Sequence, residues 1–188
     1  MIKILINLTA YDKLLTGVQP GSSSGFFYPY KNLHNEKGIT PMADIQRSAN
    51  AVWQGDLRGG NGKISTPSGV LQDDAYTFAT RFENAAGTNP EELIAAAHSA
   101  CFSMAFAGAL SKAGFQPTAI RTRAVVEMEK GDAGFSVTRV RLETEGEVPN
   151  IDEAKFQALA NDAKVNCPIS RLLTPGLKGV DLTAKLVK

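Results

Sequence analysis

The chain has 188 residues, of which 43% are hydrophobic and 21% charged, and its formal net charge is +1. This length is typical of one domain, and the balanced charge argues against a nucleic-acid or anionic-membrane partner. No uninterrupted apolar run approaches the ~20 residues of a membrane span. The two cysteines are too few for a disulfide-rich secreted domain, so their chemistry becomes the main question.

The first 41 residues differ in character from the rest. The apolar run at residues 2–8 is short beside the ~7–15 residues of a secretory h-region. Residues 21–25 have the composition of a linker, and the aromatic cluster at 26–30 has no periodicity. We interpret residues 1–41 as a tag, a leader or an arm outside the domain, which then spans residues 42–188. A native arm that packs on a neighbouring chain is the alternative.

Three short strands are predicted in the first half of the domain. Apolar and polar residues alternate around Trp53, and a glycine-rich turn at residues 59–62 precedes a second strand at 63–66. Alternation resumes over residues 76–82. Because successive side chains of a strand point to opposite faces, Arg81 is expected to point away from the aromatic side chains of the third strand.

A long helix is predicted to begin at Thr88 or Asn89, where a capping side chain precedes a proline and two glutamates. It should end near Gly114. The helix is apolar nearly all round, which is typical of a helix buried on most sides. One small domain rarely buries such a helix alone, so a second chain is one way to cover it. One face of the helix carries Ile94, Ala97, Cys101, Met104 and Gly108.

A β-hairpin is predicted next, with a long strand over residues 120–128 and a turn at 131–134. On the return strand the apolar residues change phase by one position near Thr138, which indicates a β-bulge.

The remaining elements are two helices and a strand. Asn150 and Glu153 have the spacing of a capping box for the first helix, Cys167 precedes a short second helix, and residues 180–186 alternate as a last strand. The predicted order β-β-β-α-β-β-α-β, with hairpins and no regular βαβ repeats, favours the α+β class.

The two cysteines stand in different local settings. Cys101 lies in the middle of the long helix on an apolar face, beyond the reach of that helix's N-terminal amides, and burial disfavours a thiolate. Cys167 stands at a helix N-terminus, which favours a thiolate. Local physics alone therefore selects Cys167 as the nucleophile. If Cys101 has that role, a cation must approach it; Arg81 is our candidate, with Glu91 as the carboxylate that a buried guanidinium needs.

One arginine cannot easily contact both of these helix residues, because Glu91 and Cys101 lie about 15 Å apart along the helix axis. Either Arg81 moves between them, or a partner-chain helix brings the carboxylate close. The alternative is an ordinary helix acid and a surface arginine. His98, one turn before Cys101, is open to three interpretations: a general base, a metal ligand with both cysteines, or a packed core histidine, which is the commonest case.

Several segments, in order and at matching spacing, resemble the OsmC branch of the OsmC/Ohr family. The likeness runs from about Arg47 to the C-terminus and leaves out the first 41 residues. The segments that carry it are Trp53-Gln54-Gly55-Asp56, Thr66-Pro67-Ser68-Gly69-Val70-Leu71, Thr80-Arg81-Phe82-Glu83, Gly87-Thr88-Asn89-Pro90-Glu91-Glu92-Leu93-Ile94, Ala97-His98-Ser99-Ala100-Cys101-Phe102-Ser103-Met104 and Cys167-Pro168-Ile169-Ser170.

The resemblance implies a thiol-dependent peroxidase of oxidative and osmotic stress defence, which reduces organic hydroperoxides and, less efficiently, hydrogen peroxide. It implies an α+β fold in which two long central helices are wrapped by antiparallel sheets of an intertwined homodimer, with active sites at the interface. A lipoyl-type dithiol would be the reductant. We expect a cytoplasmic protein without a cofactor or metal.

The resemblance also assigns roles. Cys101 would be the peroxidatic thiolate, Cys167 the resolving thiol that forms a disulfide with it, Arg81 the group that stabilises the thiolate, and Glu91 the carboxylate that holds Arg81. This assignment reverses the choice of nucleophile made from local physics.

Three other functions use the same residues. They are a zinc site from Cys101, Cys167 and His98, a Cys-His hydrolase that uses Cys101 and His98, and a non-enzymatic dimer with inert thiols. The cysteines stand 66 positions apart, which is far more than the tight spacing of structural zinc sites.

Overall fold

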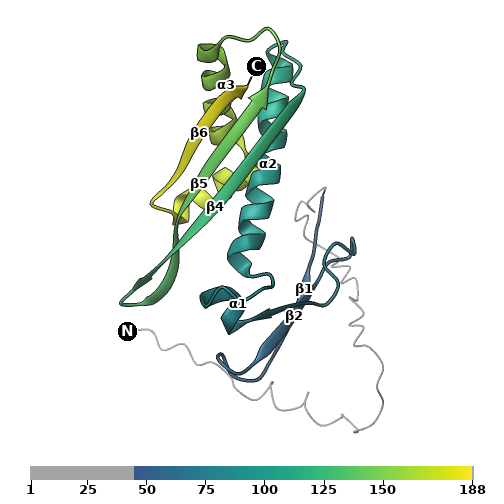
Figure 1. Cartoon of the computed structure of the whole chain (residues 1–188), viewed down its shortest axis with the longest axis vertical. Coiled ribbons are helices and arrows are strands. Elements are labelled where there is room, and N and C mark those ends of the chain that lie inside the picture. The colour runs from purple at the N-terminus through teal and green to yellow at the C-terminus, as the bar shows by residue number, and fades with distance from the viewer. Residues whose placement is uncertain (1–44, 188) are drawn as a thin grey trace, which may run out of the picture. The chain divides into compact units, whose positions relative to one another are not determined.

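A computed structural model describes residues 45–187 of the chain, and Gln46–Lys188 form one compact unit. The interpretation of residues 1–41 as an arm falls outside the described residues, so the proposed domain boundary stays a prediction. Figure 1 shows the elements, which are β1 (Asn50–Gln54), β2 (Asn61–Ser65), β3 (Asp74–Thr77), α1 (Phe78–Phe82), α2 (Pro90–Lys112), β4 (Ala119–Gly131), β5 (Gly134–Glu147), α3 (Glu153–Asn166), α4 (Pro168–Leu173), the 3-10 helix η2 (Thr174–Gly176) and β6 (Gly179–Val187).

The strands form two three-stranded sheets, in the orders β1-β2-β3 and β4-β5-β6. The first sheet is antiparallel throughout. In the second, β4 and β5 are antiparallel, whereas β5 and β6 run parallel, with Leu142 opposite Leu182. The expectation of antiparallel sheets is therefore wrong for β6. The chain crosses from β5 to β6 through α3 and α4, and such a crossover returns the strand in the parallel direction. The α+β class is confirmed.

The third strand is predicted over residues 76–82, but only its first two residues belong to β3 and the rest belong to α1. β3 ends at Thr77, whose side chain accepts a hydrogen bond from the backbone N–H of Thr80, while the Thr80 hydroxyl accepts one from the Thr77 backbone. This reciprocal capping box starts α1 and turns the chain out of the sheet. Arg81 consequently lies in the last turn of a short helix, and the prediction that it is a strand residue is wrong.

The long helix begins where the sequence predicts. Asn89 caps α2 by accepting a hydrogen bond from the Glu92 backbone N–H at 2.9 Å, and Pro90 opens the first turn. The helix ends at Lys112 with Ala113 as its C-cap, and Gly114 follows with a φ of 88°. That positive φ is left-handed backbone, which glycine adopts without strain.

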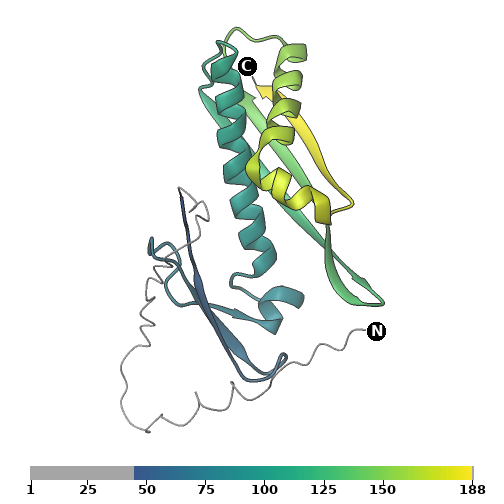
Figure 2. The same ribbon diagram turned by 180° about the vertical axis from the view of Figure 1, so that it is seen from behind.

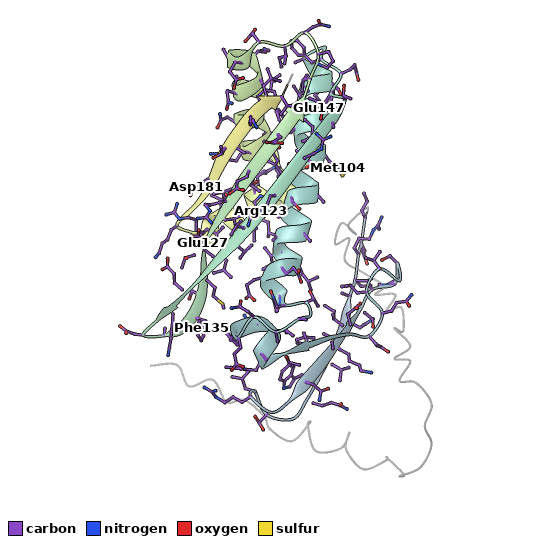
Figure 3. The ribbon with its side chains drawn as sticks, in the orientation of Figure 1. Met104, Arg123, Glu127, Phe135, Glu147 and Asp181 are labelled. Carbon is purple, nitrogen blue, oxygen red and sulfur yellow. The ribbon has the colours of Figure 1, made fainter. Side chains whose placement is uncertain are left out.

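The predicted burial of this helix is wrong for a single chain. Only one stripe of α2 is buried: His98, Phe102, Phe106 and Leu110. The opposite side exposes small and apolar residues, and Met104 is 78% exposed (Figure 3). The exposed stripe is made up of Ala97, Ala100, Met104 and Gly108.

By length and composition α2 passes a test for a membrane-spanning helix, with a mean hydropathy of 1.6 over its most apolar window. It is the one helix in residues 45–187 that does so. The expectation that no segment approaches this length overlooked it, because His98 and several serines interrupt its apolar run. The core helix of a soluble protein passes the same test, so the finding is weak evidence for a membrane location.

The predicted hairpin and bulge are confirmed. Gly131 pairs with Gly134 at the turn, and the register changes between Glu127, opposite Arg139, and Met128, opposite Val137. Thr138 is therefore the extra residue of a bulge. The cap of α3 differs from its prediction: Asp152, and not Asn150, accepts the hydrogen bond from the Lys155 backbone N–H.

Helices cover one face of the second sheet (Figure 2). The core lies between this face and α2, α3 and α4, and all ten buried apolar residues belong to it. They are Phe102, Phe106, Leu110, Val140, Leu142, Val148, Phe156, Ala160, Ala163 and Cys167.

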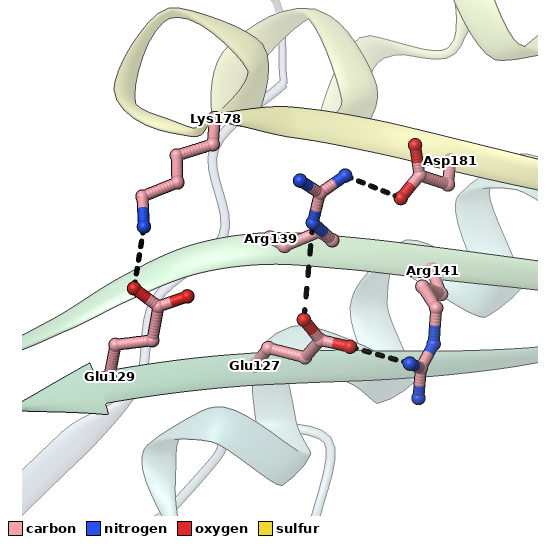
Figure 4. Close-up of polar contacts among 6 residues, drawn as sticks. All are labelled: Glu127, Glu129, Arg139, Arg141, Lys178 and Asp181. Carbon is pink, nitrogen blue, oxygen red and sulfur yellow. Dashed lines mark hydrogen bonds and ion pairs between the residues drawn. The ribbon is translucent and has the colours of Figure 1, made fainter.

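The other face of the second sheet carries ion pairs between neighbouring strands. Arg139 bonds Asp181 at 2.7 Å and approaches Glu127 on β4, which also pairs with Arg141 (Figure 4). These side chains are 32–54% exposed to solvent, and exposed pairs each contribute at most about 1 kcal/mol to stability. This face is therefore a solvated surface.

Candidate active site

The fold brings the two cysteines together across 66 positions of sequence. Their sulfur atoms lie 3.3 Å apart and share a hydrogen bond, and both thiols are free. Cys101 comes from the middle of α2, whereas Cys167 is both the last cap of α3 and the first residue before α4. Packing of α4 against α2 therefore produces the pair.

The two thiols differ in exposure. Cys101 is half-buried, and Cys167 is completely buried. Burial raises the pKa of the Cys101 thiol, and the adjacent Cys167 raises it further, whereas a hydrogen bond from the backbone N–H of Ile169 lowers it. The expectation that helix N-terminal amides cannot reach Cys101 holds for α2 itself. The N–H that lowers the pKa of Cys101 belongs to another helix, because Ile169 lies in the first turn of α4.

Arg81 and Glu91 also meet, as predicted. The Arg81 Nε donates to Glu91 Oε2 at 3.1 Å and its Nη2 to Oε1 at 2.8 Å. This bidentate geometry is the strong form of an arginine–carboxylate pair. The Arg81 side chain is 37% exposed and that of Glu91 is 14% exposed. Glu91 lies in the first turn of α2, where the positive end of the helix dipole stabilises its negative charge.

Within one chain, α2 keeps the Arg81–Glu91 pair apart from the cysteine pair. Glu91 and Cys101 stand on the same helix, which separates them by about 15 Å along its axis. The cysteine pair and the Arg81–Glu91 pair are each well formed on their own. The catalytic roles of all four residues stay predictions.

An apolar hollow of about 390 Å³ lies beside Arg81. Its walls come from the end of β1, the β1–β2 connection, the end of β3 and α1. Trp53 in it packs against Tyr76 with the rings tilted and their centroids 5.4 Å apart. The lining residues are Trp53, Gly55, Leu57, Thr77, Phe78, Arg81 and Phe82. The hollow offers a guanidinium at the edge of an apolar surface.

His98 is a buried core residue that hydrogen bonds a residue of α4. Its Nε2 lies 2.8 Å from the hydroxyl oxygen of Ser170, and its Nδ1 is buried with no hydrogen-bond partner among residues 45–187. Burial lowers the pKa of His98 from its ordinary 6.5. Within residues 45–187 no hydrogen bond joins His98 to either cysteine, and no three His, Cys, Asp or Glu side chains group as a metal site. The zinc and Cys-His alternatives therefore gain no support from these residues.

Two residues of this region had no role assigned from the sequence, Ile169 and Ser170. Both belong to the Cys-Pro-Ile-Ser segment at the start of α4. The segment carries part of the family resemblance, but which of its atoms face α2 follows only from the packing of the two helices.

Comparison with known proteins gives consistent matches. The family model described as OsmC-like protein matches residues 83–179. The chain is 50% identical over 129 residues to the Escherichia coli protein named peroxiredoxin OsmC, a match that spans 69% of this chain and 90% of that protein. It is 30% identical over 116 residues to the organic hydroperoxide resistance protein OhrB of Bacillus subtilis, or 61% of this chain and 83% of that one.

Solved structures agree with this assignment. The crystal structure of OhrB from Bacillus subtilis has a TM-score of 0.56 at 26% identity and covers 74% of this chain and 98% of that chain. An organic hydroperoxide resistance protein from Elizabethkingia anophelis has a TM-score of 0.62 at 24% identity, over 77% and 100% of the two chains, and shows likeness of fold. With the sequence matches above, these findings show that the chain belongs to the OsmC/Ohr family.

Proposed function

We propose that this protein is a thiol-dependent peroxidase that reduces organic hydroperoxides to alcohols, with Cys101 as the peroxidatic residue and Cys167 as the resolving residue. The names of its relatives, peroxiredoxin and organic hydroperoxide resistance protein, support the activity. The observation that carries the mechanism is the 3.3 Å separation of two thiols of unequal exposure.

The unequal exposure of the two thiols supports this division of roles. A hydroperoxide from solvent meets the half-buried Cys101 before the fully buried Cys167. The Cys101 thiolate attacks one peroxide oxygen, the O–O bond breaks, and the alcohol leaves with a proton, so that Cys101 becomes a sulfenic acid. Cys167 then attacks this sulfur, a disulfide forms, and one water molecule leaves. The balance is one hydroperoxide reduced and two thiols oxidised.

The first step needs a thiolate, and the environment of Cys101 in one chain opposes it. Burial raises the pKa of this thiol, and the Ile169 N–H only partly offsets that effect. A guanidinium near the sulfur would favour the charged form. We place Arg81 in this role, held by Glu91, and assign the pair to the second chain of a homodimer because the helix separates Glu91 from Cys101 by about 15 Å in one chain.

Two exposed surfaces support the homodimer. One side of α2 exposes Ala97, Met104 and their neighbours, and small residues let two helices approach closely. The β1-β2-β3 sheet contributes no residue to the buried apolar core within residues 45–187. An intertwined homodimer with two central α2 helices would cover both surfaces. The exposed apolar side of α2 would then be buried by the second chain and not by a membrane.

The substrate class follows from the hollow beside Arg81. Its apolar walls, with Trp53 and Phe78, favour hydroperoxides that carry a hydrocarbon group, because apolar area removed from water contributes about 25 cal/mol per Å² to binding. Hydrogen peroxide has no such group and should react less efficiently. In this proposal the hollow of one chain faces Cys101 of the other.

A lipoyl-type dithiol is the reductant in this proposal. Its first thiol attacks the disulfide, and its second thiol closes a ring that releases the product, so one molecule delivers both electrons. Catalytic thiols that must be reduced again in each cycle belong in a reducing compartment. We therefore place the protein in the cytoplasm, in defence against oxidative and osmotic stress.

Mass spectrometry of the intact protein tests the core of the proposal. After one equivalent of cumene hydroperoxide, we expect cumyl alcohol and a Cys101–Cys167 disulfide, which dihydrolipoamide then reduces. Two free thiols with the hydroperoxide unconsumed would refute the proposed activity.

A mixing experiment tests the division of the site between chains. Arg81→Ala and Cys101→Ser chains are each expected to be inactive. If the site combines Cys101 of one chain with Arg81 of the other, unfolding and refolding them together restores one intact site per mixed dimer. In a random mixture that is roughly a quarter of the wild-type sites. No recovery, with mixed dimers verified by mass, would place both residues of each site on one chain.

A further inference from the structure

A second polar contact joins α2 to α4, one helical turn away from the cysteine pair. His98 precedes Cys101 by one turn on α2, and Ser170 follows Cys167 by one turn on α4. The Nε2 of His98 lies 2.8 Å from the Ser170 hydroxyl oxygen. Both side chains are buried within one chain, with His98 at 0% and Ser170 at 2% exposure, so the contact does not depend on a second copy.

The proton of this hydrogen bond is assigned to the histidine. Burial lowers the pKa of His98, so the ring is neutral and carries one proton. If the proton were on Nδ1, a buried N–H would be left without a partner, since Nδ1 has none among the described residues. A buried lone pair without a partner is more common in proteins than a buried N–H without one. Nε2–H therefore donates to the Ser170 oxygen.

This contact adds to the packing that holds the start of α4, where Cys167 is fully buried and Ile169 packs against the core. The helix has six residues, and its N-terminal residue Cys167 makes no side-chain cap hydrogen bond. A helix of this length has no stability of its own. When both thiols are reduced no covalent bond joins α4 to α2, so packing and the His98–Ser170 hydrogen bond must hold it.

We propose that His98 and Ser170 are positioning residues for the resolving step. Their hydrogen bond holds the first turn of α4 so that the Cys167 sulfur and the Ile169 N–H both stay at Cys101 while the thiols are reduced. Neither residue touches the substrate in this proposal. The inference rests on the proposed function for its biological meaning, but the geometry it describes exists in the reduced protein without any peroxide.

The first experiment therefore uses no peroxide. Protein dithiol and oxidised glutathione exchange to give protein disulfide and two reduced glutathione molecules, and the equilibrium constant is the effective concentration of one cysteine at the other. The variants are Ser170→Ala and His98→Leu. The second of these removes the unpartnered Nδ1 and is therefore expected to fold even if the first does not. The control is Ser99→Ala, because the Ser99 hydroxyl bonds only the Ala96 carbonyl of its own helix.

We expect each of the two variants to lower the effective concentration roughly three- to tenfold, the net worth of one hydrogen bond. The control should match the wild type. The double variant should lose no more than the larger single loss, because both changes delete the same contact. An unchanged effective concentration in both single variants, or fully additive losses, would overturn the inference.

The second experiment follows the fate of oxidised Cys101. With a small excess of cumene hydroperoxide, the sulfenic acid either forms the disulfide or is oxidised again to the sulfinic acid. In the Ser170→Ala variant we expect a several-fold larger sulfinic fraction, because the sulfenic acid waits longer for Cys167. An unchanged sulfinic fraction would count against the positioning role. If the wild type fails to consume hydroperoxide, the proposed function fails, whereas the glutathione equilibrium still decides the role of the contact.

Discussion

The two parts of residues 45–187 are built in different ways. From α2 onward, helices cover a sheet and enclose all ten buried apolar residues. The β1-β2-β3 sheet and α1 contain none of them, and Leu57 in the β1–β2 connection is 65% exposed. The first part of the chain thus forms regular hydrogen-bonded strands without a core, whereas the second part has a core of its own.

The candidate site follows this division. The cysteine pair belongs to the packed part, where α2 and α4 fix both sulfur atoms. Arg81 belongs to α1, in the part without a core, and reaches Glu91 at the very start of α2. A single chain therefore brings both cysteines together in its packed part. The charged group proposed to activate Cys101 lies on the part that lacks a core.

The largest expected effect is on hydroperoxide consumption, when the cysteines of the packed part are replaced. Cys101→Ser should reduce hydroperoxide consumption to the uncatalysed background, a loss of roughly a thousandfold or more, as for other catalytic nucleophiles. Cys167→Ser should instead consume about one equivalent and stop, because the sulfenic acid forms but no disulfide follows. Stopped-flow measurement of peroxide loss separates the two results. Sustained turnover by Cys101→Ser would rule out the thiol mechanism.

The next prediction compares the same substitution in both parts. Leu110→Ala, in the core, should lower the free energy of unfolding by about 3–5 kcal/mol. Leu57→Ala should change it by no more than about 0.5 kcal/mol in a single chain, where this side chain is 65% exposed, and by more if the proposed homodimer covers the first sheet. Urea denaturation of both variants makes the comparison. A loss at Leu57 as large as that at Leu110 would mean that another surface buries the first sheet in solution.

A smaller effect is expected from the charged pair. Arg81→Ala should slow the reaction of Cys101 with hydroperoxide by roughly a hundredfold at neutral pH, the typical worth of one charge-stabilising group. Arg81→Lys should recover only part of that rate, because an ammonium cannot form the bidentate pair.

The rate of Arg81→Ala should also rise more steeply with pH than that of the wild type, because burial raises the pKa of Cys101. Arg123→Ala is the control, since Arg123 also pairs with a glutamate but on the exposed sheet face. Equal rates for Arg81→Ala and wild type would remove Arg81 from the site.

The smallest effect concerns His98 and stability. Burial lowers the pKa of His98 below its ordinary 6.5, so the unfolded chain binds a proton that the folded chain does not. The free energy of unfolding should therefore fall as the pH drops below about 6.5, by at most about 1.4 kcal/mol per pH unit. Urea titrations at pH 7.5 and 5.5 measure it. His98→Leu should show a smaller difference between the two pH values, and an equal difference would contradict the prediction.

Local signals in the sequence were enough for several elements. Asn89 and Pro90 fix the start of α2, and the phase change at Thr138 predicts the bulge. The error at α1 has a local cause, because the alternation of Phe78, Thr80 and Phe82 fits a strand as well as a short helix. The Thr77–Thr80 capping box that decides the matter has a threonine where the usual pattern has a glutamate or glutamine.

Other features depend on tertiary packing and had no local signal. The parallel pairing of β6 depends on the route through α3 and α4. The Ile169 N–H reaches Cys101 only because α4 packs on α2, and the same packing joins His98 to Ser170. The family resemblance predicted roles for four residues, and these roles stay predictions. The unequal exposure of the two thiols is a separate observation that supports the proposed order of reaction.

The position of Cys167 has a consequence for anyone who alters it. This residue is the joint between two helices, the last cap of α3 and the first of α4, and its sulfur makes no cap hydrogen bond. A serine at the joint would supply the hydroxyl that helix N-termini prefer, whereas an alanine would not. Serine and alanine are therefore not equivalent replacements for Cys167. Serine removes the sulfur and strengthens the joint, whereas alanine removes the sulfur alone.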